Sequence, residues 1–234
     1  MNLGKDDDPM TVKRSVFYID ERKNTASTEL AHLLEKCIEK VERPWDEIVF
    51  VCIGSDRITG DSLGPMVGHQ LSRYRWKDFY VYGTLDCPVH ALNLENTLDE
   101  LKERHPSALY IAVDASLGSQ KHVGFISIGT GSIYPGAGVH KSLPPVGDIF
   151  ITGILNVSGT FEHFLLQTTR LSSVVQMAET ITAGIEETFT RTYEKRRLLP
   201  DAWFHPEERK RRLCWANDTG LAALSTESSS GIIS

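Results

Sequence analysis

Two aspartates are the residues of this sequence best placed to do chemistry. Asp61 lies in the stretch GSDRITGDSLGP (54–65), which follows an apolar run, and Asp114 comes directly after the apolar run YIAV. A carboxyl group at the point where a strand leaves the core is partly desolvated, which raises its pKa, and a second carboxyl nearby raises it further. Two such groups can divide the roles of acid and base near neutral pH. The chemistry that this pair predicts is general acid–base catalysis.

Both aspartates also have simple structural explanations. Asp61 could be the N-cap of a helix over residues 62–73, because an Asp side chain accepts hydrogen bonds from the first N–H groups of a helix. Asp114 could cap the end of its strand by binding nearby backbone amides. The residues alone leave these interpretations open beside the catalytic one.

The elements that must position these residues follow from hydrophobic spacing. Apolar residues at helical spacing predict amphipathic helices, and short β-branched apolar runs predict buried strands. The expected helices cover 26–42, 62–73, 91–104 and 164–190, and the expected strands cover 47–54, 79–85, 108–115, 123–131 and 148–155. Because strands alternate with helices, we expect an α/β fold, a three-layer α/β/α sandwich with mostly parallel pairing and one antiparallel or edge component around 115–135.

Ligands of open α/β sheets bind outside the carboxyl ends of the strands. The polar residues expected at this edge are Asp61, Asp86, His90, Asp114, His140 and Asp148. The last two lie in or after a glycine-rich loop that matches neither the dinucleotide fingerprint nor a P-loop. The sequence therefore predicts one polar edge, without a phosphate-binding motif.

The composition of the chain limits the classes of protein to which it can belong. The chain has 234 residues and a net charge of −6, which argues against recruitment of nucleic acid by a basic field. No run approaches the roughly 18 apolar residues of a membrane span, and the first residues are acidic rather than signal-like. The four cysteines are widely spaced without a C-x-x-C motif, which predicts reduced thiols and a cytoplasmic protein.

The chain divides into three parts by composition. We expect a loose lead-in over residues 1–24, a single α/β/α domain over 25–192, and a tail over 193–234 that is basic and then Ser/Thr-rich. Such a tail is typical of poorly ordered sequence.

Three segments of the domain resemble a known family. They are FVCIGSDRITGDSLGPMVGHQL, YIAVDASLG and IYPGAGVHKSLPPVGDIFITGILNV, within about 47–190. They resemble the germination protease family of spore-forming bacteria, and more closely its shorter relatives, the YyaC-type sporulation proteins. The resemblance implies a phosphorylase/hydrolase-like sandwich similar to hydrogenase-maturation endopeptidases. It also places the catalytic carboxyls at Asp61 and Asp114.

The resemblance thus implies an endopeptidase-like hydrolase of the sporulating cell or spore core that cleaves a peptide or a small spore protein. One aspartate would activate a water molecule while the other protonates the scissile carbonyl. Arg57, Asp86, Gly136 and His140 would position the substrate. No cofactor is expected. The sequence departs from the protease at Asp56 and Arg57, where that enzyme has uncharged residues.

Two other functions fit the same residues. One is a metal-assisted amide hydrolase in which Asp61, Asp114 and His140 hold a divalent ion. The other is a non-catalytic sporulation protein that binds a peptide or regulates a partner through the same edge without cutting. The sequence does not set an oligomeric state.

Overall fold

A six-stranded mixed sheet forms the centre of the computed structural model, which describes residues 15–135, 143–159 and 162–197. Along the sheet the strands are ordered β1-β5-β6-β4-β2-β3. Their bounds are β1 Val16–Asp20, β2 Glu47–Cys52, β3 Phe79–Tyr82, β4 Ala108–Gly118, β5 Phe125–Thr130 and β6 Ile149–Val157.

Parallel pairing holds the interior of the sheet together. Strands β6, β4, β2 and β3 run parallel to one another, whereas β5 is antiparallel to β6 and β1 is antiparallel to β5. The predicted antiparallel component is therefore confirmed, and it makes up one end of the sheet. Because β5 runs antiparallel to β6, the loop after β5 begins at the amino end of β6.

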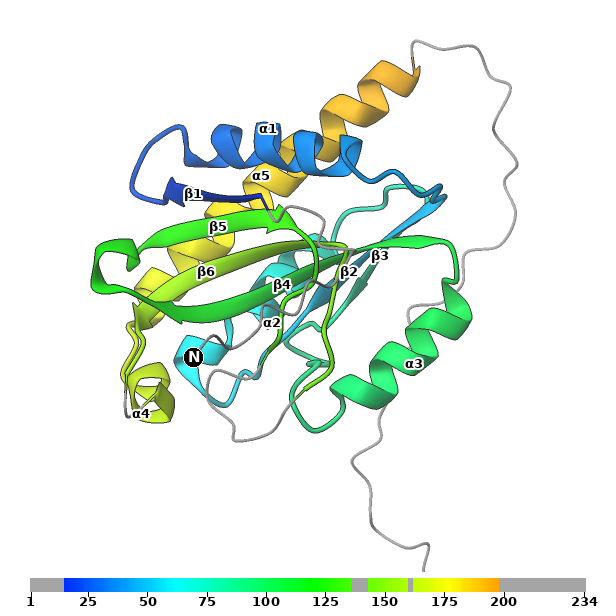
Figure 1. Ribbon diagram of the computed structural model, residues 1–234. Helices are drawn as coiled ribbons and strands as arrows, with labels where there is room; N and C mark the ends of the chain where they lie inside the picture. Colours follow the sequence, from blue (N-terminus) through cyan, green and yellow to red (C-terminus); the bar gives the residue numbers. More distant parts are fainter. Residues whose placement is uncertain (1–14, 136–142, 160–161, 198–234) are drawn as a thin grey trace, which may run out of the picture.

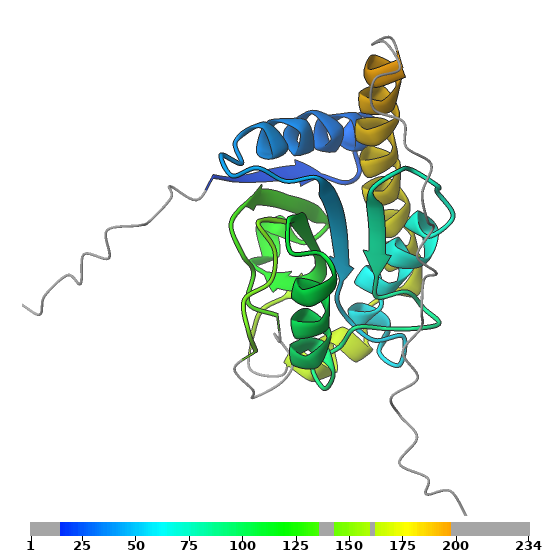
Figure 2. The same ribbon diagram turned by 90° about the vertical axis from the view of Figure 1, so that its right-hand side faces the viewer.

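Helices cover both faces of the sheet, as Figures 1 and 2 show. Their bounds are α1 Ala26–Glu39, α2 Leu63–Leu71, α3 Leu94–Arg104, α4 Glu162–Gln167 and α5 Leu171–Arg197. The larger core cluster joins alternate sheet residues such as Phe50 and Ile111 to α1, α2 and α5. The smaller one joins the intervening residues, such as Val51 and Ala112, to α3. The predicted α/β/α sandwich is confirmed.

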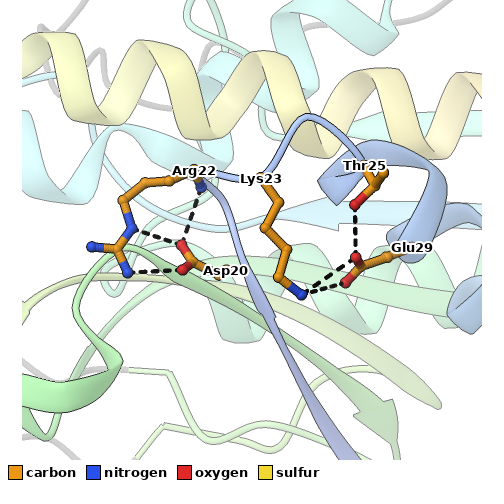
Figure 3. Close-up of polar contacts among 5 residues, drawn as sticks. All are labelled: Asp20, Arg22, Lys23, Thr25 and Glu29. Atoms are coloured by element: carbon orange, nitrogen blue, oxygen red, sulfur yellow. Dashed lines mark hydrogen bonds and ion pairs between the residues drawn. The ribbon is translucent and has the colours of Figure 1, made fainter.

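The N-terminal strand departs from the expected lead-in over residues 1–24. Strand β1 pairs with β5 at the edge of the sheet, with Ile19 buried in the core and Tyr18 half exposed. The turn after it is held by charged contacts (Figure 3). The guanidinium of Arg22 donates to the Asp20 carboxylate at 2.7 and 2.8 Å, and the Lys23 ammonium lies 3.4 Å from the Glu29 carboxylate. Residues 1–14 lie outside the described part of the chain.

The C-terminal helical region is divided in two. In place of one helix over 164–190, α4 ends at Gln167 and α5 begins at Leu171. Helix α5 continues to Arg197, into the region expected to form a tail, and residues 198–234 lie outside the described part. Cys37 and Cys52 are free and buried as expected, but Cys87 is disulfide-bonded, contrary to the prediction of reduced thiols throughout. Among the described residues, no helix has both the length and the apolar character to cross a membrane.

Candidate active site

Asp61 is carried by a single 3-10 turn, η1 (Thr59–Asp61), between β2 and α2. The N-cap of α2 is Ser62, and its hydroxyl donates to the carbonyl oxygen of Thr59 at 2.7 Å. Interpreting Asp61 as the helix cap is therefore wrong, because the next residue occupies that position. The carboxyl of Asp61 is left available for another role.

Four glycines fix the backbone around the carboxyl end of β2, and we call them the glycine cluster: Gly54, Gly64, Gly68 and Gly83. A Cβ added at Gly54 would lie 2.0 Å from the carbonyl oxygen of Asp61, and one at Gly64 would lie 2.0 Å from that of Ile53. At Gly68 and Gly83 the corresponding distances to backbone oxygens are 2.0 and 1.8 Å. Backbone therefore packs directly on backbone here, which only glycine allows. These close contacts explain why glycine occupies positions 54 and 64 of the loop that carries Asp61.

Asp114 lies inside strand β4 and is only 8% exposed. Its Oδ1 accepts a hydrogen bond from the backbone N–H of Ala115 at 2.8 Å. The expected amide contact is thus present, but the strand continues to Gly118, so Asp114 does not end it. A buried carboxyl with one amide donor is still short of the several donors that would offset the loss of water.

The charge of Asp61 acts on the carboxyl of Asp114. Burial raises the pKa of Asp61 to about 6, although a hydrogen bond from the backbone N–H of Ser55 opposes the shift. Burial also raises the pKa of Asp114 well above its usual value, and the negative charge of Asp61 raises it further, while the Ala115 N–H opposes it. The turn η1 contacts β4, so residues fifty-three positions apart share one site. The shared site thus raises the pKa values of both carboxyls toward the range in which a pair can divide the roles of acid and base.

Two of the four residues expected to bind substrate lie in the described part of the chain. Arg57 is exposed, and its backbone N–H donates to the hydroxyl of Ser55 at 3.3 Å. The Asp86 carboxylate is exposed and lies 3.9 Å from Nδ1 of His69 on α2. Gly136 and His140 lie outside the described residues. The role of these four residues in binding stays a prediction.

Asp148 lies at the opposite edge of the sheet, contrary to the prediction. It immediately precedes β6, where its carboxylate forms an ion pair with Arg43 at 2.5 Å and accepts the backbone N–H of Tyr110 at 2.9 Å. The reason is that β5 runs antiparallel to β6, so the connecting loop begins and ends at the amino end of β6. Its last part then packs on the α3 face through Leu143 and Val146.

Three hydroxyl residues beside Asp114 were not predicted from the sequence. In the sheet register Thr152 of β6 lies opposite Asp114, and Ser127 of β5 lies opposite Thr152. The hydroxyls of Thr152 and Ser127 are 2.7 Å apart, and that of Ser116 lies 3.4 Å from Thr152. A sequence signal existed, since Ser127 and Thr152 are single polar residues within the apolar strand runs FISIG and IFITGIL.

A metal ion would need a further ligand beside the two aspartates. In the described part of the chain no three His, Cys, Asp or Glu residues are grouped to hold one. The expected set of Asp61, Asp114 and His140 includes a residue outside that part, so the set stays a prediction.

The chain is similar to a protein family, to a bacterial protein and to a solved structure. A family model described as "Protein of unknown function (DUF1256)" matches residues 18–184. The uncharacterized protein YyaC of Bacillus subtilis (strain 168) is 44% identical over 184 residues, which cover 78% of this chain and 88% of that protein. Among solved structures, the NiFe hydrogenase maturation protease HycI of Thermococcus kodakarensis KOD1 is similar, with a TM-score of 0.46, 19% identity, and coverage of 68% of this chain and 99% of that chain.

The family match spans β1 to α5, and so it includes both aspartates and the glycine cluster. The identity with YyaC likewise extends over most of both chains. The chain therefore belongs to the DUF1256 family and is a YyaC-type protein.

Proposed function

We propose that this protein is a hydrolase that cleaves peptide bonds with the carboxyl pair Asp61 and Asp114. The observation that carries the proposal is the unequal titration of the two groups within one site. Burial raises the pKa of Asp61 to about 6, whereas burial together with the negative charge of Asp61 raises the pKa of Asp114 well above its usual value. At neutral pH the ionised Asp61 is a general base and the protonated Asp114 is a general acid.

The proposed reaction is addition of water to the scissile carbonyl. The Asp61 carboxylate takes a proton from water as the water oxygen bonds to the carbonyl carbon. Asp114 donates its proton to the carbonyl oxygen and becomes a carboxylate. In the second step the C–N bond breaks, Asp61 gives its proton to the leaving amine, and Asp114 regains a proton from the tetrahedral intermediate. Atoms and charges balance without a cofactor.

The proposed substrate is a peptide or a small spore protein, and the proposed location is the cytoplasm of the sporulating cell or the spore core. Both follow from the resemblance of the segments around Asp61 and Asp114 to the germination protease family. Time-lapse microscopy of a fluorescent fusion during sporulation checks the location. Signal in vegetative cells alone would contradict it.

A peptide-library digest followed by mass spectrometry tests the reaction. We expect cleavage by the wild-type chain, and a loss of at least about 100-fold in kcat in both Asp61→Asn and Asp114→Asn. Asp99→Asn is the matched control, because that carboxylate is exposed on α3, where it lies 3.5 Å from the ammonium of Lys102. Unchanged turnover in both site variants would end the proposal.

The pH profile provides a second check with a defined sign. Because Asp61 must be ionised, kcat/KM should fall as the pH drops below about 6. Because Asp114 must be protonated, activity should also fall at high pH. Loss of activity in chelator, restored by a divalent ion, would favour the metal-assisted amide hydrolase instead. Saturable peptide binding without product would favour the non-catalytic sporulation protein.

A further inference from the structure

The hydroxyls of Thr152 and Ser127 lie in a buried row that begins at Asp114. These residues occupy neighbouring strands in register, so their side chains project from the same face of the sheet as that of Asp114. Thr152 is 8% exposed and Ser127 is 6% exposed. Ordinary strand spacing places Thr152 about 5 Å from Asp114 across the sheet, which is within reach of a hydroxyl–carboxyl hydrogen bond between their side chains.

Counting donors identifies one proton in this row that has no assigned acceptor. Each hydroxyl donates one proton, and the 2.7 Å contact between Thr152 and Ser127 uses only one of the two. Ser116 donates from the other side, 3.4 Å from both the Thr152 hydroxyl and the carbonyl oxygen of Gly153. The contacts of the described residues give the remaining proton of the buried pair no other acceptor.

The carboxyl of Asp114, in turn, has fewer hydrogen-bond donors among the described residues than it can accept. Its Oδ1 accepts one backbone N–H, from Ala115 at 2.8 Å, and that is the hydrogen bond the described residues supply to this carboxyl. An ionised carboxylate can accept about four hydrogen bonds, and in a buried position each missing one is costly. Among the described residues Asp61 is the ionisable group whose charge acts on Asp114, and it repels a second negative charge.

We infer that Thr152 is a positioning residue whose hydroxyl donates a hydrogen bond to the carboxyl of Asp114, and that Ser127 orients this hydroxyl by donating to it. The donation matters most when Asp114 has given its proton to the substrate and carries a negative charge beside Asp61. The catalytic part of this inference rests on the proposed hydrolysis, whereas the hydrogen bond itself does not.

Valine and serine at position 152 separate the hydroxyl from the shape of the side chain. Thr152→Val should lower kcat at least about tenfold with little change in KM, because the bond forms to a charge that develops during the reaction. Thr152→Ser should restore most of the rate. Ser127→Ala leaves Thr152 in place and should give a smaller loss. Thr182→Val is the matched control, since Thr182 lies on α5 and is also buried, but its hydroxyl has no hydrogen-bond partner within the described part of the chain.

The ¹³Cγ resonance of Asp114, identified by its absence in Asp114→Asn, reports the hydrogen bond without any turnover. It should move in Thr152→Val, return in Thr152→Ser and stay in Thr182→Val. An unmoved resonance in Thr152→Val overturns the inference even if the enzyme hydrolyses peptides. A moved resonance in a chain without any hydrolase activity supports the hydrogen bond and refutes the hydrolysis. If Thr152→Val does not fold, Ser127→Ala decides by the same resonance.

Discussion

At the residue scale, the pair Asp61 and Asp114 lowers the stability of the fold as the pH rises. Burial raises the pKa of Asp61 to about 6, against about 3.8 in the unfolded chain. Between these values the folded protein binds more protons than the unfolded chain, so the free energy of unfolding falls with increasing pH. The cost is absent below about pH 4 and complete above about pH 6.

Asp61→Asn should therefore stabilise the protein at neutral pH more than in acid. We expect the difference from wild type to grow by on the order of 2 kcal/mol between pH 4 and pH 7. Urea unfolding at both pH values measures it, with the exposed Asp86→Asn as control. Equal differences at the two pH values would refute the burial of the Asp61 carboxyl described above.

Two threonines on helix α5 allow another residue-scale test. The buried hydroxyl of Thr182 has no hydrogen-bond partner among the residues that the structure describes, whereas that of Thr188 donates to the carbonyl oxygen of Gly184 at 2.9 Å. Thr182→Val should stabilise the protein by about 1 kcal/mol, because it removes an unsatisfied polar group without changing volume. Thr188→Val should destabilise it by about 1 kcal/mol. Denaturant midpoints compare the two directly, and effects of the same sign would contradict the assignment.

At the element scale, the turn η1 is held against helix α4. A Cβ added at Gly60 would lie 2.6 Å from the carbonyl oxygen and 2.8 Å from the Cα of Leu166. The Asn156 side chain donates to the carbonyl oxygen of Leu165 at 3.0 Å, which ties α4 to the end of β6. Helix α4 thus packs directly against η1 and helps to fix the position of Asp61.

Gly60→Ala should consequently push η1 away from α4. We expect a destabilisation of about 2 kcal/mol and, if the proposed hydrolysis is correct, a loss of kcat larger than the loss of folded protein explains. Gly159→Ala is the control, because a Cβ there would meet nothing within 4 Å. Thermal unfolding measures the first effect, and active-site titration separates the second. Similar stabilities for the two variants would argue against the close contact.

A second element-scale contact secures the end of helix α3. The buried His105 follows this helix, and its ring lies 2.6 Å from the Glu47 carboxylate and 2.9 Å from the Tyr82 hydroxyl. Three elements, α3, β2 and β3, meet at this ring. His105→Phe keeps the aromatic bulk but removes the hydrogen bonds of the buried ring to both Glu47 and Tyr82, so the free energy of unfolding should fall by about 2 kcal/mol. Urea unfolding of this variant and of Tyr82→Phe, which removes only one partner, should rank the two losses in that order.

At the scale of the whole molecule, β1 joins the start of the chain to the far end of the sheet. Its side chains alternate, with Ile19 in the core and Tyr18 half exposed beside the ring of His122. Ile19→Ala should lower the free energy of unfolding by about 2–4 kcal/mol, and Tyr18→Ala by less than about 1 kcal/mol. Urea unfolding measures both. The reverse order would place the strand in the opposite register.

The sequence predicted most of the sheet because β2, β4 and β6 are buried on both faces, so each is a continuous apolar run. It missed β1 because an edge strand with half-exposed Val16 and Tyr18 lacks that run. It did not divide the helix over 164–190, because helical spacing continues across the break and does not show that Leu166 and Thr169 pack against Gly60, more than one hundred positions away.

The candidate site was predicted at its centre and not at its periphery. Asp61 and Asp114 were found because each follows an apolar strand run, and the parallel pairing of β2 with β4 brings those ends together. Asp148 was misplaced because the direction of β5 depends on pairing that periodicity does not reveal. Thr152 was missed because its importance depends on its neighbour across the sheet, not on its neighbours along the chain.

The proposed catalysis depends on the glycine cluster, although the glycines have no side chains that could take part in it. Because Gly54, Gly64, Gly68 and Gly83 let main-chain atoms of separate segments touch, no rotamer change can absorb an added methyl group there. In a saturation mutagenesis library, these four codons should be as intolerant as the two aspartate codons under selection for activity. Unlike the aspartates, they should stay intolerant when the selection is for soluble expression alone.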